Sequence, residues 1–139
     1  MKLFFKCNGW VKVVLLLCLM VKGMPSFGQN EALADSLIQV YESGNYDPAL
    51  KLKILSGITV HLPDPDCILA YSDSLMTEAI RQDSTLYKFN SHLQTGNALQ
   101  QKGNLSGALD SYFKALEITD RNTEKNQVAI MYTAIAAVY

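Results

Sequence analysis

Apolar residues recur every third or fourth position along most of the chain after residue 29, which is the period of an amphipathic α-helix. The first such run spans 31–43 and stops before Gly44, a residue that commonly ends helices. A second run follows Asp47-Pro48, where a capping residue precedes a proline at the first helical position. Gly57 weakens the middle of this second helix, and the β-branched residues 58–60 leave an earlier end open.

Four further helices are separated by residues that interrupt helical geometry. Pro63-Asp64-Pro65 forms a break, because a residue before proline is displaced from helical angles, and Asp64 is placed to cap the third helix. Asp83-Ser84 separates the third helix from the fourth, and Lys102-Gly103-Asn104 closes the fourth and caps the fifth. Residues 121–123 end the fifth helix, and a sixth continues to Tyr139. The pattern contains no convincing strand and therefore predicts an all-α fold.

The first 28 residues have the three parts of a secretory signal peptide. Lys2 and Lys6 form a basic region ahead of an unbroken apolar run at 13–21, and the small residues Ser26 and Gly28 follow at the spacing that signal peptidase prefers. A membrane-spanning helix needs about 20 apolar residues, and flanking lysines keep this run well below that length. The sequence therefore predicts a leader over 1–28, cleaved before Gln29, and an exported mature chain that is periplasmic or secreted.

The charge of the mature chain argues against nucleic-acid binding. Four of the twelve Lys and Arg residues lie in the first 22 positions, which hold none of the thirteen acids, so the chain from Gly23 onward has a formal charge of −5. Binding to a phosphate backbone depends on clustered Lys and Arg, and such clusters are missing from this part of the sequence. We therefore expect no nucleic-acid partner.

Residues with catalytic or metal-binding chemistry are sparse. The two histidines, His61 and His92, fall in different predicted helices, so no metal motif is formed. Asp64 and Asp66 alternate with prolines, which favours helix capping over catalysis. Cys67 is the only cysteine outside the leader and lies at a helix start, where a dipole lowers a thiol pKa, although a buried or half-buried structural cysteine is the commoner case. We expect no active site, metal or cofactor in these residues.

An internal repeat joins the fourth and sixth predicted helices. Residues 89–99 can be aligned with 129–139 at an offset of 40, which brings Gly96 and Ala136 together as small residues at a close helix approach. The fifth helix then supplies a turn glycine, a small contact residue, an aromatic wedge and a second small contact residue. These are Gly103, Ala108, Tyr112 and Ala115.

This order of small and aromatic residues resembles the tetratricopeptide repeat family, through the segment TGNALQQKGNLSGALDSYFKALEI at 95–118. His92 and Leu99 depart from the pattern, standing where the family favours Trp and Tyr. The resemblance implies a solenoid of helical hairpins over 29–139 and a concave groove that binds an extended peptide. In that groove it places Asn97, with Asn90 and Gln94 nearby, because carboxamides both donate to and accept from a peptide backbone. The alternative is that Asn97 is an ordinary solvated helix residue.

The order of leader, helical segments and repeat further resembles exported tetratricopeptide regions of bacterial signalling proteins. That resemblance implies a periplasmic sensory or input region of a signal-transduction protein, continuing beyond residue 139 into a membrane span and a cytoplasmic output domain. Two alternatives stay open. In the first, the chain is the beginning of an enzyme, an adenylate/guanylate cyclase or a histidine kinase, whose catalytic part follows residue 139. In the second, it is a free-standing exported scaffold. Membrane association is expected only through a downstream segment.

Overall fold

The computed structural model describes residues 27–119 and 125–139, and these residues form helices with no β-strand among them. The all-α prediction is therefore confirmed. The elements in chain order are α2 (Phe27–Ser43), the short 3-10 helix η2 (Pro48–Leu50), α3 (Lys51–His61), α4 (Pro65–Arg81), α5 (Thr85–Gln101), α6 (Leu105–Glu117) and α7 (Lys125–Ala136).

Side-chain caps set three of the helix starts, as the sequence predicts. Asp47 accepts a hydrogen bond from the Ala49 amide at 2.9 Å, and Asp64 accepts one from the Cys67 amide at 3.0 Å. Asn104 likewise accepts from the amide of Gly107 at 3.1 Å. Each bond satisfies an amide that has no partner within its own helix, so each polar residue fixes where the next helix begins.

Two boundaries differ from the expectation, and one lies outside the described residues. α3 runs through the β-branched residues to His61, so the earlier end does not occur. α7 ends at Ala136 instead of continuing to Tyr139, because 137–138 form a turn in which the Val138 amide donates to the carbonyl of Ile135. The expected end of the fifth helix at 121–123 falls outside the described residues, and α6 itself ends at Glu117.

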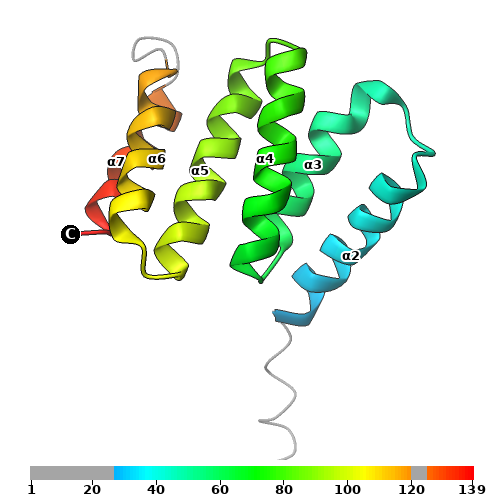
Figure 1. Ribbon diagram of the computed structural model, residues 1–139, viewed down its shortest axis with the longest axis horizontal. Coiled ribbons are helices and arrows are strands. Elements are labelled where there is room, and N and C mark those ends of the chain that lie inside the picture. Colours follow the sequence, from blue (N-terminus) through cyan, green and yellow to red (C-terminus); the bar gives the residue numbers. More distant parts are fainter. Residues whose placement is uncertain (1–26, 120–124) are drawn as a thin grey trace, which may run out of the picture.

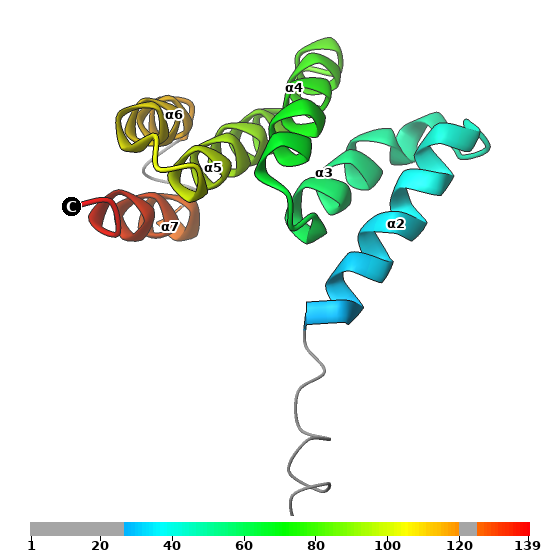
Figure 2. The same cartoon turned by 60° about the horizontal axis from the view of Figure 1, so that its bottom comes forward.

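Each helix packs mainly against its neighbours in sequence, and α3 also contacts α5. Figure 1 shows the helices side by side in chain order from α2 to α7. In Figure 2, α4 and α6 lie on one side of this row, whereas α3, α5 and α7 lie on the other. Helices α3 to α7 therefore form two layers, and α5 packs against both α4 and α6.

The buried apolar side chains form two clusters. One holds Leu52, Leu55, Leu75 and Ala79 between α3 and α4, with tyrosines from α2, α4 and α5 around it. The other joins α5, α6 and α7 through Phe89, Ala108, Tyr112, Ala115, Leu116 and Met131. Not every apolar residue of the predicted helices is buried by its neighbours: Leu33 and Leu50 are 44% and 45% exposed. Periodicity identifies a helix face, but only the neighbouring helices decide how much of it is buried.

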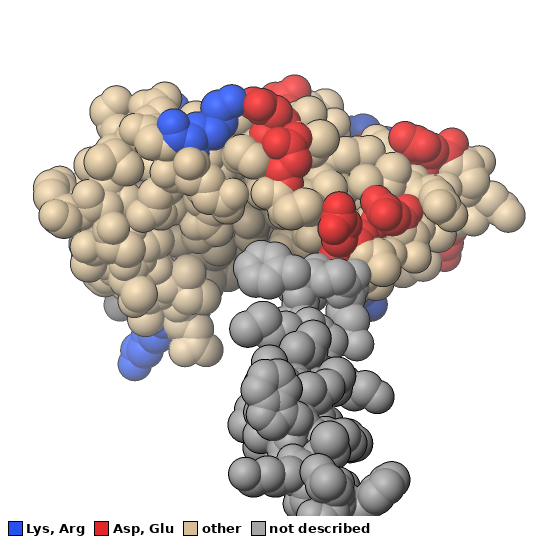
Figure 3. All heavy atoms as spheres, turned by 90° about the horizontal axis from the view of Figure 1, so that it is seen from below, with Lys and Arg blue, Asp and Glu red and all other residues tan. Residues whose placement is uncertain are grey.

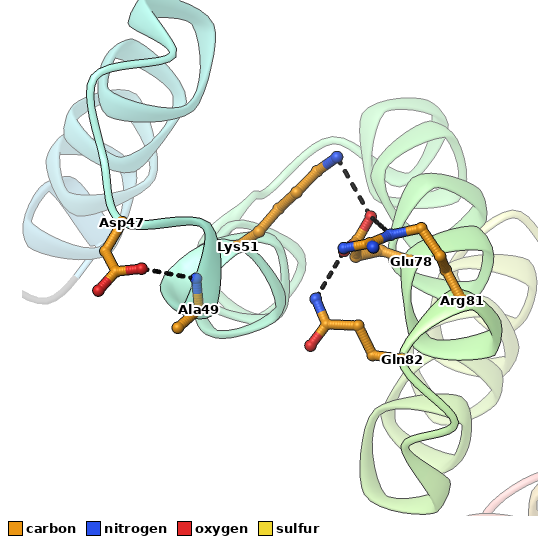
Figure 4. A network of polar contacts seen from close by, with 6 residues as sticks. All are labelled: Asp47, Ala49, Lys51, Glu78, Arg81 and Gln82. Carbon is orange, nitrogen blue, oxygen red and sulfur yellow. Dashed lines mark hydrogen bonds and ion pairs between the residues drawn. The ribbon is translucent and has the colours of Figure 1, made fainter.

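A carboxylate on α4 connects this helix to α3 (Figure 4). Glu78 is almost fully covered, and its carboxylate accepts from Gln82 Nε2 at 2.6 Å and from Arg81 Nε at 3.1 Å. Lys51 of α3 completes the arrangement with an ion pair at 3.2 Å. Hydrogen bonds from Arg81 and Gln82, together with the Lys51 ammonium, hold the pKa of Glu78 at about 2, below its ordinary 4.5.

Candidate functional site

One face of α5 borders an open hollow of about 400 Å³ that carries most of the polar residues selected from the sequence. Its polar wall consists of carboxamides, and its apolar wall comes from α3, α4 and the segment between them. The carboxamides are Gln94, Asn97, Gln100 and Gln101, and the other lining residues are Thr59, Val60, Leu62 and Ile68. We call this set the carboxamide hollow. None of the described residues that line it is charged.

The periodicity of α5 explains why the carboxamides gather. Gln94, Asn97 and Gln101 are separated by three and four positions, so they lie on one face of the helix. A carboxamide offers two N–H donors and an acceptor oxygen, the same groups that a polypeptide backbone presents. The hollow is therefore chemically suited to an uncharged chain with alternating donors and acceptors.

Asn97 is the most constrained of these side chains. Its Oδ1 accepts a hydrogen bond from the Tyr112 hydroxyl at 2.8 Å, and its Nδ2 donates to Gln94 Oε1 at 3.3 Å. The Tyr112 hydroxyl also lies 3.1 Å from Oε1 of Gln100, whose Nε2 donates to the Ala137 carbonyl at 3.3 Å. Since a hydroxyl carries one proton, it serves these two oxygens in alternation. Asn97 thus has partners within the protein and is not simply a solvated helix residue.

Tyr112, which donates to this network, is itself a core residue. Its ring is fully buried in the cluster of α5, α6 and α7, and burial raises the pKa of its hydroxyl above the ordinary value. The hydroxyl stays protonated at neutral pH and acts as a donor. Through it, the wall of the carboxamide hollow is connected to the core.

The structure brings together two of the three predicted groove residues. Gln94 and Asn97 line the carboxamide hollow, but Asn90 is not among its lining residues. Asn90 instead lies one turn earlier on α5, with its Nδ2 3.5 Å from Ser56 Oγ of α3. Its position is that of a contact between helices.

Sequence reasoning missed two carboxamides and the whole apolar wall. Gln101 could have been found, because it continues the spacing of Gln94 and Asn97 by one helical turn. Val60, Leu62 and Ile68 could not, since they come from other elements and reach the hollow only through the packing of α3 and α4 against α5.

The residues expected to pack the repeat occupy different environments. Gly96, Ala108, Tyr112 and Ala115 are buried at the contact of α5 with α6. Gly103 is exposed in the turn between these helices with a φ of +75°, a left-handed conformation that favours glycine. Ala136 is exposed in the last turn of α7, and its role as a contact residue stays a prediction.

The cysteine expectation is wrong in both of its forms. Cys67 is exposed, so it is not a buried structural residue. A hydrogen bond to the Asp64 carboxylate, reinforced by partial burial and by the charges of Asp64 and Asp66, raises the pKa of the Cys67 thiol. The direction of this shift is opposite to the one expected from the helix dipole, and it lowers the fraction of thiolate at neutral pH.

The remaining polar chemistry of the described residues is limited. No group of three or more His, Cys, Asp and Glu side chains within 27–119 and 125–139 is arranged to hold a metal ion. Within the same ranges no helix is long and apolar enough to cross a membrane. Viewed from below, most of the surface carries neither acidic nor basic side chains (Figure 3).

Comparison with known proteins adds no relative to this picture: no protein-family model, curated protein or solved structure matches the chain.

Proposed function

We propose that this chain is an exported protein-binding module of the tetratricopeptide type, and that it forms the periplasmic sensory or input region of a bacterial signal-transduction protein. The observation that carries the binding role is the carboxamide hollow. Its four carboxamides on one face of α5 oppose an apolar wall, and both match an extended peptide with alternating polar backbone and apolar side chains.

The tetratricopeptide assignment rests on the segment 95–118 and on the way its residues pack. Gly96 of α5 lies against the ring of Tyr112 of α6, which is the relation of small residue and aromatic wedge that the motif implies. Helices that contact mainly their sequence neighbours are also what a solenoid of hairpins requires. Export rests on the leader over 1–28, which lies largely outside the described residues. α2 begins at Phe27, two residues before the expected cleavage point.

The ligand chemistry is specific enough to test. Because the described residues that line the hollow are uncharged, a bound peptide is held by neutral hydrogen bonds and apolar contacts, and its affinity changes little with salt. A selection from a library of random peptides against the chain should enrich uncharged segments with apolar residues at alternate positions. Affinities of the enriched peptides are then measured by calorimetry at two salt concentrations.

Two substitutions with matched controls test where such peptides bind. Gln101→Ala removes one exposed carboxamide of the hollow, whereas Gln39→Ala removes an exposed carboxamide from α2. We expect Gln101→Ala to weaken binding about fivefold, the effect of one neutral hydrogen bond, and Gln39→Ala to leave it unchanged. For the apolar wall, Val60→Ser is the test and Val40→Ser on α2 is the control. Both valines are exposed in the structure. Equal binding by all four variants would exclude the carboxamide hollow as the peptide site.

Export and the signalling role need separate measurements. The exported protein should be recovered from the periplasm with an N-terminus at Gln29, as determined by mass spectrometry. Retention of the leader would contradict the cleaved signal peptide. Reading the coding DNA beyond the codon for Tyr139 tests the parent protein. We expect further repeats, a membrane span and an output domain, whereas an immediate stop codon would leave a free-standing exported scaffold.

A further inference from the structure

A second hollow, of about 300 Å³, lies on the opposite face of α5, between α4 and α6. Its α4 wall is formed by Leu69, Asp73 and Met76. On α5 and α6 it is lined by Ser91, His92, Thr95, Ser111 and Lys114. We call it the hydroxyl hollow. Ser91, His92 and Thr95 face away from the carboxamide side of α5, so the two hollows do not share residues.

The hydroxyl groups of this hollow act as acceptors. Ser91 donates its proton to the backbone carbonyl of Ser72 at 2.7 Å, and Ser111 donates to that of Gly107 at 3.0 Å. Each hydroxyl has a single proton, so the lone pairs are what these two buried side chains offer to a ligand. The wall therefore favours a ligand that brings its own donors.

The rim of the hollow carries one carboxylate and one ammonium, and the ammonium is paired with a second carboxylate. Asp73 is an exposed carboxylate on its rim. The one lining cation, Lys114, is paired with Asp110 at 2.6 Å, and Glu117 of the same helix adds a further negative charge near His92. Burial and the neighbouring Lys114 lower the pKa of His92, so the imidazole is neutral at pH 7.

We propose that the hydroxyl hollow binds a primary alkylammonium group. An ammonium carries three donors, and Asp73, Ser91 and Ser111 supply acceptors along the wall of the same hollow. Leu69 and Met76 provide an apolar wall for the alkyl stem. Two sources have this chemistry, a free aliphatic amine and the side chain of a lysine in a partner protein. The site is independent of peptide binding in the carboxamide hollow.

Matched probes test the proposal in the full chain labelled with ¹⁵N. n-Pentylammonium is compared with 1-pentanol, and Nα-acetyl-lysine amide with Nα-acetyl-norleucine amide, so each pair differs in the ammonium group. We expect saturable shifts of the backbone amides of Ser91, Thr95 and Ser111 with the ammonium member of a pair and none with its neutral counterpart. Binding of pentylammonium alone identifies a small amine as the ligand, and binding of the lysine amide identifies a lysine side chain.

One substitution localises the effect. Asp73→Asn should weaken ammonium binding about fivefold, whereas Asp35→Asn, which removes an exposed carboxylate from α2, should not change it. The proposal would be overturned if the neutral probes gave saturable shifts equal to those of the ammonium probes. It would also be overturned if the Asp73→Asn variant bound the ammonium probes as tightly as the original chain does. The absence of a saturable shift with either ammonium probe would likewise overturn it.

Discussion

A methyl group on Gly96 would lie 2.3 Å from Cε1 of Tyr112 and within 3 Å of two further atoms of that ring. Tyr112 is fully buried among α5, α6 and α7, so its ring could move away only by displacing other core side chains. The absence of a side chain at Gly96 therefore allows α5 and α6 to approach, and this contact places the Tyr112 hydroxyl against Asn97.

Substituting Gly96 by alanine should consequently destabilise the protein. Overpacking of a well-packed core costs about 1–3 kcal/mol, and the better helix propensity of alanine returns up to about 1 kcal/mol. We expect a net loss of about 1–2 kcal/mol in the free energy of unfolding, measured by urea denaturation. Gly57→Ala is the control, since its methyl would meet only the tip of the flexible Leu37 side chain, at 2.9 Å. A Gly96→Ala variant as stable as the Gly57→Ala variant would refute the close approach.

Removing the hydroxyl of Tyr112 tests its connection to the carboxamide hollow. Tyr112→Phe keeps the buried ring but leaves Asn97 Oδ1 and Gln100 Oε1 without their donor. We expect a loss of about 1 kcal/mol in unfolding free energy and weaker binding of the selected peptides, because Asn97 loses a contact that orients it. Tyr132→Phe, at a tyrosine that is 54% exposed, should change neither quantity. Equal effects of the two substitutions would show that the network does not orient the hollow.

The network around Glu78 makes stability depend on acid. The folded pKa of about 2 is below the ordinary 4.5, so the unfolded chain takes up a proton first as the pH falls. The stabilisation is therefore complete above pH 4.5 and is lost between that pH and about 2. The whole shift corresponds to about 3 kcal/mol, but the Arg81 side chain is 66% exposed, and solvent screening reduces the expected gain to about 1 kcal/mol.

Glu78→Gln isolates this contribution. The variant should be about 1 kcal/mol less stable at pH 7, and the difference from the original chain should shrink as the pH falls toward 2. Asp35→Asn on α2 serves as the control for loss of one negative charge. The unfolding free energies of both proteins are measured by denaturation at several pH values. A difference in unfolding free energy that is constant from pH 7 to 2 would contradict the lowered pKa of Glu78.

The reactivity of Cys67 should respond to its helix cap. Asp64→Asn keeps a good capping residue but removes the carboxylate that raises the pKa of the thiol. We expect faster alkylation of Cys67 by iodoacetamide at pH 8, followed by mass spectrometry of the peptide that contains this residue. Asp47→Asn, the same change at the cap of η2, should leave the rate as it was. An unchanged rate in Asp64→Asn would mean that this carboxylate does not control the thiol.

Much of the helical organisation follows from local residues. The helix starts at Asp47, Asp64 and Asn104 could be predicted because a capping side chain and its amide lie within three positions of each other. The end of α7 could not, since nothing in the residues before Tyr139 resembles a stop signal. The neighbour of Gly57 could not be predicted either, since the side-chain tip of Leu37 reaches it from another helix, α2.

The candidate site was recognised in part for the same reason. Gln94 and Asn97 belong to one helix face, so their proximity follows from the helical period alone. Asn90 lies near the same face but contacts α3, because the neighbouring helix covers that turn of α5. Conversely, the hydroxyl hollow joins three helices, and no local pattern brings Asp73, His92 and Ser111 together.

The sequence by itself therefore determined the all-α class, the capped helix starts and the polar face of α5, all of which depend on interactions within a few residues. Tertiary structure decided which apolar helix faces are buried, which residues line the two hollows, and how Cys67 and Glu78 titrate. These properties depend on atoms brought close by helix packing or by the orientation of side chains at a helix end. A one-dimensional pattern does not contain those distances.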